Sequence, residues 1–370
     1  MAQNVIGIDA SRMLVTELTG TETYTCNIVR ALLERPHEER YRLYLNASEP
    51  PTDLPGHPDV RLMPFPRIWT HVRLSLEMVR AAPDLLFVPA HVIPIIHPKS
   101  IVTIHDLGYL VYPDSHSVPQ RRMLQAATRW NVRSARHIVV PSGTTARDVR
   151  SRLKVPNERI TTIPHGVSPR FTPAPPNEIA RIRKEHELDR PYILSVGTRH
   201  PRKNYGRLAQ AHRHLLAQGH DIDLVIAGKR GWLADEVDRD LIDAGLGDRL
   251  RILDYVPIAN LCPLYSGAQA FAMPSLYEGF GLPLLEAMAC GTPAIAANQS
   301  SLVELAGDAA VLVDPLDVEA LSHALVSVVQ SENARATLSR EGRTQARRFT
   351  WDEAASATAN VFAQVLSAAP

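Results

Sequence analysis

The sequence has few cysteines, few aromatic residues, almost no net charge and no long apolar run. Its three cysteines, Cys26, Cys262 and Cys290, stand far apart in 370 residues, so no CxxC zinc or redox motif exists and we expect a reducing compartment. Because 40 Lys and Arg residues balance 39 Asp and Glu residues, we expect no nucleic-acid partner. The most apolar stretch, 85–96, contains two prolines and is too short to span a bilayer. With no secretory signal at the N-terminus, these absences predict a soluble, cytoplasmic protein.

Short β-rich runs alternate with helical patterns along the chain, which is typical of parallel sheets covered by helices. One series of strands is predicted at 5–8, 41–45, 60–63, 85–88, 101–104, 138–140 and 160–163, and a second at 192–196, 224–227, 250–252, 270–273, 294–297 and 310–313. Five prolines at 164–176 predict a linker. We therefore predict an α/β fold with two Rossmann-like, doubly wound domains, 1–172 and 173–349, facing across a cleft. The last segment, 350–370, contains a helix with no strand left to cover, and we expect it to cross back to the first domain.

In open α/β sheets, ligands bind beyond the carboxyl ends of the strands. After the predicted strand 270–273, Pro283 and Gly291 fit the first turn and the end of a short helix that starts near Leu282. Gly279 and Gly281 leave the backbone before this helix uncrowded, so residues 279–282 form a predicted anion site. The residues of this site are Gly279, Phe280, Gly281 and Leu282. Glu278 and Glu286 flank it and suit sugar and ribose hydroxyls. The alternative is a capped helix with incidental glutamates.

A second candidate anion site follows the predicted strand 192–196. Gly197 is followed by Arg199, Arg202 and Lys203, and these cations suit a diphosphate leaving group. The alternative is a solvated basic loop. In the first domain, His105 ends the predicted strand 101–104 and is a candidate for hydrogen bonding to a sugar or for proton transfer; a structural histidine is the alternative.

Two weaker features concern the first strand-to-helix loop and metal binding. Gly20 and Thr21 lie in that loop, where glycine permits close approach of a phosphate and an ordinary helix cap is the alternative. The pair Asp221 and Asp223 precedes a strand, and Asp238 and Asp240 diverge on a helix, so neither spacing suits magnesium. We predict no metal and no cofactor other than the substrate itself.

Arginines concentrate in the predicted helix at 118–136. Four of them, Arg122, Arg129, Arg133 and Arg136, share one helical face, near apolar side chains. Such a face suits a phosphorylated acceptor or an anionic membrane, which would place the protein at the periphery of the inner membrane face. The alternative is an ordinary solvated face.

Together these residues resemble the retaining glycosyltransferase family 4, which has the GT-B fold. The resemblance is carried by Glu278-x7-Glu286, by Val196-Gly197-x3-Pro201-Arg202-Lys203-Asn204 and by Ser300-Ser301-Leu302-x-Glu304. The sequence 274–281 is most similar to mannosyltransferase-type members.

The resemblance implies a role for each candidate. Arg202, Lys203 and the backbone of 279–281 would hold the donor diphosphate, and Glu286 would hold the ribose. Glu278 and His105 would contact the transferred sugar, and the backbone of Tyr255 and Val256 would meet the nucleobase. Thr198 departs from the arginine found in many members, so either one donor cation is missing or Arg199 replaces it.

The predicted activity is metal-independent transfer of a hexose, with mannose from GDP-mannose favoured, to a glycan or lipid-linked acceptor in cell-surface polysaccharide or glycolipid assembly. An epimerase or hydrolase of the same fold and a non-catalytic sugar-nucleotide-binding protein remain alternatives. A dinucleotide oxidoreductase is disfavoured because no strand is followed by GxGxxG.

Overall fold

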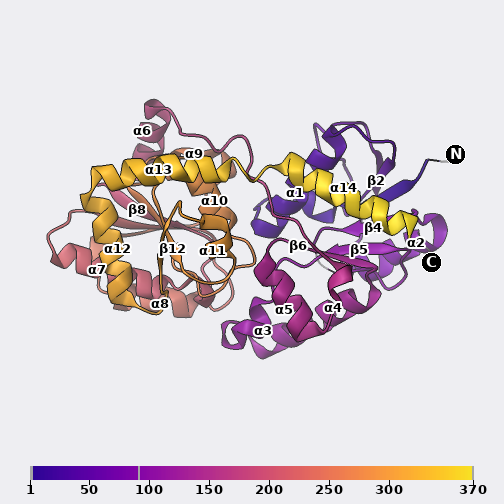
Figure 1. The fold of residues 1–370 in the computed structure, drawn as a ribbon, viewed down its shortest axis with the longest axis horizontal. Helices are drawn as coiled ribbons and strands as arrows, with labels where there is room; N and C mark the ends of the chain where they lie inside the picture. The colour runs from indigo at the N-terminus through magenta and orange to yellow at the C-terminus, as the bar shows by residue number, and fades with distance from the viewer. Residues whose placement is uncertain (1–2, 91, 369–370) are drawn as a thin grey trace. The chain divides into compact units, whose positions relative to one another are not determined.

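A computed structural model describes residues 3–90 and 92–368, and the chain in it divides into two compact units. The first unit comprises Met1–Leu107, Pro119–Gly166 and Thr350–Pro370, and the second comprises Gly108–Val118 and Val167–Phe349. Each unit contains a parallel sheet with helices packed on it (Figure 1). The two predicted Rossmann-like sheets are confirmed.

The first sheet has the strand order β3-β2-β1-β4-β5-β6-β7, and all its neighbours pair in parallel. Its central strands are buried along their length because helices cover both faces, which explains their uninterrupted apolar sequence. The strands are β1 Val5–Asp9, β2 Arg40–Leu45, β3 Asp59–Leu62, β4 Leu85–Val88, β5 Ser100–Thr103, β6 His137–Val140 and β7 Ile160–Thr162. The helices of this unit are α1 Gly20–Glu34, α2 Ser75–Ala81, α4 Val118–Ser134, α5 Gly143–Leu153 and α14 Trp351–Ser367.

The second sheet has the order β10-β9-β8-β11-β12-β13, again parallel. Its strands are β8 Tyr192–Val196, β9 Asp223–Ala227, β10 Leu250–Leu253, β11 Ala270–Met273, β12 Ala294–Ala297 and β13 Val311–Val313. Helices α7, α8 and α12 pack together and share one core with the sheet, while α9, α10 and α13 form another packed group. The α-helices are α3 Gly108–Val111, α6 Pro176–Glu185, α7 Tyr205–Ala217, α8 Ala234–Asp243, α9 Ile258–Ser266, α10 Leu282–Ala289, α11 Ser301–Ala306, α12 Val318–Gln330 and α13 Glu332–Ala346.

The C-terminal helix α14 belongs to the first unit, as predicted. It packs along α1 (Figure 1), and its Phe362 ring lies 5.2 Å from that of Phe87 on β4. Lys99 Nζ also donates to the carbonyl oxygen of Ala368, beyond the helix end, at 2.8 Å. The helix therefore completes the cover of the first sheet.

The division between the units falls a few residues from the predicted boundary of 172 and 173. Gly166 belongs to the first unit because it lies directly against the backbone of Trp351; a Cβ there would come within 2.2 Å of the Trp351 nitrogen. The next residue, Val167, donates to the carbonyl oxygen of Phe349 at 3.0 Å, and both belong to the second unit. The chain thus leaves and re-enters the first unit at neighbouring residues.

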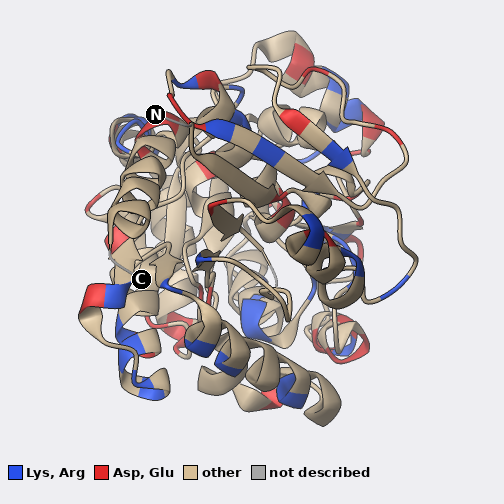
Figure 2. Ribbon diagram, turned by 90° about the vertical axis from the view of Figure 1, so that its right-hand side faces the viewer, with Lys and Arg blue, Asp and Glu red and all other residues tan. Residues whose placement is uncertain are grey.

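Charged residues of both signs are scattered over helices and strands (Figure 2), in keeping with the near-zero net charge. In the described part of the chain, no helix is long and apolar enough to cross a membrane.

Candidate functional site

The two predicted anion loops of the second unit begin at neighbouring strands. β8 pairs with β11, so the loops that follow Val196 and Met273 leave the same edge of the sheet side by side. The Leu276 nitrogen donates to the carbonyl oxygen of Arg202 at 2.8 Å, which joins the loops directly. The topology thus brings together Arg202 and Leu276, which are 74 positions apart in the chain.

Lys203, Arg202 and Glu278 form a charged cluster at this junction. Lys203 Nζ donates to Glu278 Oε1 at 2.8 Å, and Arg202 Nη1 lies 3.7 Å from Glu278 Oε2. Arg202 Nη1 also donates to the carbonyl oxygen of Tyr277 at 2.6 Å. Burial would raise the pKa of Glu278, but the charges of Lys203 and Arg202 outweigh burial and lower it below its ordinary value. Glu278 therefore remains a carboxylate beside two cations.

Gly197 gives the Lys203 side chain room to reach this cluster. A Cβ on Gly197 would lie 3.1 Å from Lys203 Cε and 3.2 Å from the Tyr205 hydroxyl. The Tyr205 hydroxyl in turn donates to the Gly197 carbonyl oxygen at 2.9 Å. The glycine is needed for close packing, and any direct contact of Gly197 with a donor remains a prediction.

Asn204 connects three loops of this edge. It adopts the left-handed conformation at φ 62°, which asparagine tolerates better than most residues. Its buried amide Nδ2 donates to the carbonyl oxygens of Pro274 at 3.0 Å and Pro315 at 2.7 Å. The sequence motif contained Asn204 without indicating this bracing role, because the partners are backbone atoms far away in the chain.

The segment that carries Glu278 is held by two serines at the start of α11. Ser301 Oγ donates to the carbonyl oxygens of Glu278 at 2.9 Å and Phe280 at 2.8 Å. The Glu278 nitrogen donates to Ser300 Oγ at 3.2 Å. Gly281 precedes α10 at φ 113°, and a Cβ there would meet Leu302 Cδ2 at 2.7 Å. Residues 279–282 therefore lie at the predicted helix start, in a braced loop.

Glu286 lies within α10, away from the cations. The Tyr265 hydroxyl of α9 donates to Glu286 Oε2 at 2.9 Å. Burial raises the pKa of Glu286 to about 7, and the tyrosine hydrogen bond offsets this only in part. The two glutamates therefore differ: Glu278 stays ionised, whereas Glu286 titrates near neutrality.

Arg199 has a different position from the one predicted. Its side chain is only 3% exposed, and its guanidinium forms ion pairs with Asp238 at 3.1 Å and Asp254 at 2.9 Å. It also donates to the Gly228 carbonyl oxygen at 3.0 Å. Because these partners occupy the guanidinium, Arg199 joins the loops after β8, β9 and β10, and we no longer assign it to the donor diphosphate. One acidic partner lies on a helix and the other in a loop, so no local sequence signal revealed them.

Tyr255 and Val256 lie between β10 and α9, at the carboxyl edge of the same sheet. Val256 is buried and Tyr255 is half-buried. Their neighbour Asp254 is fixed by Arg199, and the Gly228 nitrogen donates to the Asp254 carbonyl oxygen at 3.0 Å. Their predicted contact with a nucleobase stays a prediction.

In the first unit, His105 follows β5 and packs against Tyr24 and His165, with ring centroids 4.8 Å and 5.5 Å away. Its Nε2 lies 2.8 Å from the carbonyl oxygen of Pro89. Since a carbonyl only accepts, Nε2 carries the hydrogen and Nδ1 is the acceptor nitrogen. Burial lowers the pKa of His105, so the ring is neutral at pH 7. This arrangement suits acceptance of a hydrogen bond better than transfer of a proton.

Gly20 and Thr21 form the first turn of α1, after the capping residue Thr19. The Thr19 nitrogen donates to Glu22 Oε2 at 3.1 Å, half of the reciprocal pair that caps many helices. A Cβ on Gly20 would meet no atom within 4 Å, so packing within the protein does not require glycine there. The predicted role of Gly20 and Thr21 toward a phosphate remains a proposal.

A short segment that contains none of the predicted site residues lies against the two anion loops. Residues Gly108–Val118 belong to the second unit, where the Tyr112 ring lies 6.5 Å from that of Tyr277. The His116 ring lies 5.0 Å from that of His200. Tyr277 and His200 are immediate neighbours of Glu278 and Pro201, so this segment borders the charged cluster. The sequence feature that could have indicated this segment is the presence of aromatic residues after a strand.

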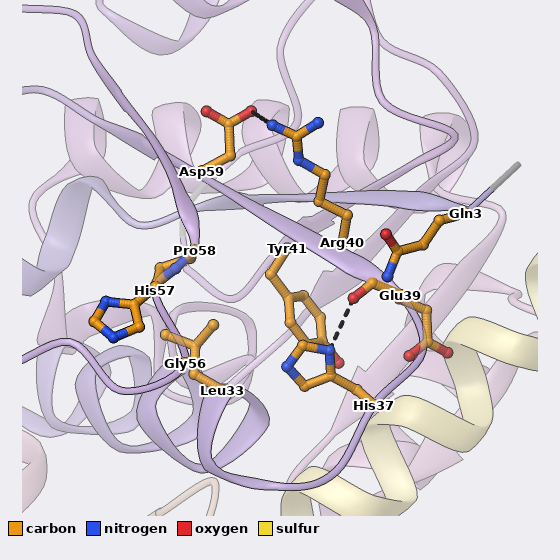
Figure 3. Close-up of a pocket in the computed structure, with 10 residues that line it drawn as sticks. All are labelled: Gln3, Leu33, His37, Glu39, Arg40, Tyr41, Gly56, His57, Pro58 and Asp59. Carbon is orange, nitrogen blue, oxygen red and sulfur yellow. Dashed lines mark hydrogen bonds and ion pairs between the residues drawn. The ribbon is translucent and has the colours of Figure 1, made fainter.

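The first unit also has a hollow of about 300 Å³ at the opposite, amino edge of its sheet. Figure 3 shows Arg40 and Asp59, which begin β2 and β3, together with His37 and His57 around it. An ion pair of 3.4 Å joins Arg40 and Asp59. Ligands of such sheets bind at the carboxyl edge, so this hollow is separate from the candidate site.

The acidic pairs lie where the sequence predicted. Asp223 begins β9 at the amino edge of the sheet, and Asp238 and Asp240 lie on α8. Among residues 3–90 and 92–368, no three His, Cys, Asp or Glu side chains gather as a metal ion would require.

Comparison with solved structures confirms the predicted fold, which is the GT-B fold. The chain is similar over its whole length to sucrose-phosphate synthase from Thermosynechococcus elongatus, with a TM-score of 0.78, 21% identity and all of both chains covered. It is also similar to Anabaena HepE in complex with UDP-glucose, with a TM-score of 0.76, 17% identity, and 98% of this chain and 100% of that one covered.

Sequence comparison gives the family. The model for Glycosyltransferase Family 4 matches residues 18–171, and that for glycosyl transferases group 1 matches residues 177–345. The O-antigen chain mannosyltransferase B of Escherichia coli is 30% identical over 376 residues, which cover 96% of this chain and 98% of the relative. The chain belongs to glycosyltransferase family 4 and is similar to its mannosyltransferase members, as the motifs indicated.

Proposed function

We propose that this glycosyltransferase transfers mannose from GDP-mannose, with retention at the anomeric carbon and without a metal ion. The acceptor in this proposal is a glycan or lipid-linked glycan in the assembly of a cell-surface polysaccharide or glycolipid. The cluster of Lys203, Arg202 and Glu278 carries the proposal, because it pairs two cations with an ionised carboxylate at the carboxyl edge of the sheet. The similarity to an O-antigen chain mannosyltransferase supports the choice of sugar and acceptor.

In the proposed reaction, Lys203 and Arg202 stabilise the negative charge that grows on the departing diphosphate. Backbone groups of 279–281 at the start of α10 add the positive end of a helix dipole. Glu278 and Nδ1 of His105 accept hydrogen bonds from the transferred sugar, and Glu286 binds the ribose. The departing phosphate oxygen receives the proton of the attacking acceptor hydroxyl, on the face from which the nucleotide leaves.

Thermal-shift measurements with GDP-, UDP- and ADP-sugars test the donor. GDP-mannose is expected to raise the melting temperature most. Stabilisation by a UDP- or ADP-sugar alone would contradict the assignment of GDP-mannose as the donor. An NMR spectrum of the product formed on a lipid-linked acceptor then gives the anomeric configuration. An inverted linkage would contradict retention, and donor breakdown that is independent of acceptor would indicate a hydrolase.

We also propose that α4 contacts an anionic membrane at the inner face of the cytoplasmic membrane. Its arginines Arg122, Arg129 and Arg133, and Arg136 just beyond it, are exposed. Met123 between them is 62% exposed, as a residue that inserts among lipids would be. Vesicles rich in phosphatidylglycerol should pellet the protein at low salt and release it at high salt. The variant Arg122→Glu/Arg133→Glu should stay in solution, and pelleting of that variant equal to the parent would contradict the proposal.

A further inference from the structure

Two of the three cysteines, 28 positions apart, meet in the second unit. Cys262 lies on α9 and Cys290 directly follows α10, with their sulfur atoms 3.8 Å apart. The Cys290 thiol donates to Cys262 Sγ. Bonded sulfurs lie about 2.05 Å apart, so a small approach of the two helices would join them.

The two thiols have different surroundings. Cys262 is half-buried and Sγ also lies 2.9 Å from the carbonyl oxygen of Thr172, whereas Cys290 is buried. The hydrogen bond from Cys290 lowers the pKa of Cys262, and the same contact, with burial, raises the pKa of Cys290. Cys262 is therefore the accessible sulfur that reacts first, and Cys290 is the sulfur behind it that can resolve the product.

The same two helices hold Glu286. Tyr265, one turn after Cys262 on α9, donates to Glu286 on α10, and its carbonyl oxygen accepts from Thr292 Oγ1 at 2.8 Å. The Cys290 nitrogen bonds to the Glu286 carbonyl oxygen at 3.0 Å. A bond between the sulfurs would therefore run beside the Tyr265–Glu286 hydrogen bond and would hold Glu286 against Tyr265.

We propose that Cys262 and Cys290 are a modification site for hydroperoxides, which convert the pair to a reversible disulfide that weakens nucleotide binding. Formation of the disulfide by a hydroperoxide does not depend on the proposed function. Its effect on binding rests on the proposed function, in which Glu286 binds the ribose: a Glu286 side chain held against Tyr265 is not free to move toward the ribose.

The chemistry needs one hydroperoxide for each disulfide. The Cys262 thiolate attacks the terminal peroxide oxygen, the O–O bond breaks, and the departing oxygen takes up the proton that Cys262 lost. The Cys290 sulfur then attacks the resulting sulfenic acid, the S–O bond breaks, and the Cys290 proton leaves with the hydroxide as water. Two thiols are oxidised and one peroxide is reduced.

Thiol counting on the full chain tests disulfide formation. Unfolded samples of the untreated protein should show three free thiols, and samples treated with an equimolar amount of hydrogen peroxide should show one. Dithiothreitol should restore all three. Peptide mapping should find Cys262 linked to Cys290, with Cys26 still free. Three remaining thiols, or Cys26 oxidised as fast as Cys262, would overturn the proposal.

Serine variants separate the two roles, and Cys26→Ser is the matched control. Cys290→Ser should accumulate sulfenic acid on Cys262 that dimedone traps, because no resolving thiol remains. Cys262→Ser should resist the same peroxide dose, and Cys26→Ser should form the disulfide like the parent. Equal melting temperatures would show that the variants fold. Formation of a sulfenic acid on Cys290 in Cys262→Ser, at the parent rate, would contradict the order of reaction.

Calorimetry with GDP tests the effect on binding. Oxidation should raise the Kd for GDP about fivefold or more in the parent and in Cys26→Ser, and not in Cys262→Ser. An unchanged Kd with a fully formed disulfide would overturn the coupling and leave the proposed function intact. Failure of the reduced protein to bind GDP, UDP or ADP would instead contradict the proposed function. The thiol count would still show whether the disulfide forms.

Discussion

Lys203 Nζ lies 2.8 Å from Oε1 of Glu278, which makes a cation from the β8 loop and a carboxylate from the β11 loop one charged unit. A donor diphosphate that approaches this unit meets a lysine already positioned by the protein. The energetic cost of fixing a flexible side chain is therefore met when the protein folds, before the substrate binds.

Replacement of Lys203 should abolish most of the activity. We expect Lys203→Ala to reduce kcat/KM by about 10²–10³-fold, because a cation aimed at the leaving group is lost. Transfer of labelled mannose at saturating acceptor measures this. Lys184→Ala, on the exposed surface of α6, is the matched control and should behave like the parent. Parental turnover in Lys203→Ala would remove the lysine from the donor site.

Replacement of Glu286 should act mainly on donor binding. We expect Glu286→Ala to raise the donor KM about tenfold with a smaller change in kcat, because its proposed partner, the ribose, is remote from the reacting bond. Tyr265→Phe is the companion variant for the same assay, because it keeps the ring and removes only the hydroxyl that donates to Glu286. A fall in kcat at constant KM in Glu286→Ala would place Glu286 at the chemistry instead.

Donor affinity should rise as the pH increases through about 7, because burial raises the pKa of Glu286 to about 7. The ionised carboxylate accepts hydrogen bonds from ribose hydroxyls better than the protonated acid, so the Kd for GDP should fall several-fold from pH 6 to 8. Glu286→Gln, which does not titrate, should show a smaller change. The raised pKa means that the folded protein holds this proton more tightly than the unfolded chain. The contribution of Glu286 to stability therefore declines as pH rises from about 4.5 to about 7.

Asn204 should prove important for stability. We expect Asn204→Ala to lower the free energy of unfolding by about 2–4 kcal/mol, because it leaves two carbonyl acceptors unpaired and puts alanine at positive φ. Asn204→Gly loses the same hydrogen bonds without the backbone strain, so it should cost less. Urea unfolding measures both, and equal losses would mean that the conformation at φ 62° carries no penalty.

Chelation should leave the proposed transferase active. Turnover after treatment with EDTA and gel filtration should match that of the untreated protein, because the proposal assigns charge stabilisation to Lys203, Arg202 and the start of α10. Loss of activity that magnesium restores would contradict metal independence.

The strands could be predicted well from the sequence, because they depend on local composition. The limits of β8, β11 and β12 agree with the predicted 192–196, 270–273 and 294–297. Contacts that join residues distant in the chain could not be predicted from the sequence. Arg199 pairs with carboxylates from other elements, and Asn204 donates to carbonyl oxygens from distant loops. The sulfur next to Cys262 likewise belongs to another element, and only the folded topology brings these partners near.

The segment Gly108–Val118 illustrates the same limit. It follows a strand of the first sheet in sequence and was assigned to the first domain, yet its contacts place it in the second unit. Hydrophobic periodicity identifies elements and carries no information on which sheet a short connecting segment will join.

The fixed hydrogen of His105 has a consequence for kinetics. The Nε2 hydrogen is donated to the Pro89 carbonyl oxygen, which fixes the neutral tautomer, and burial lowers the pKa at which the ring gains a second proton. Any inflection that His105 contributes to a rate profile should therefore lie below the ordinary histidine pKa of about 6.5. An inflection near pH 7 would instead report the ionisation of Glu286, whose pKa is raised by burial to about 7.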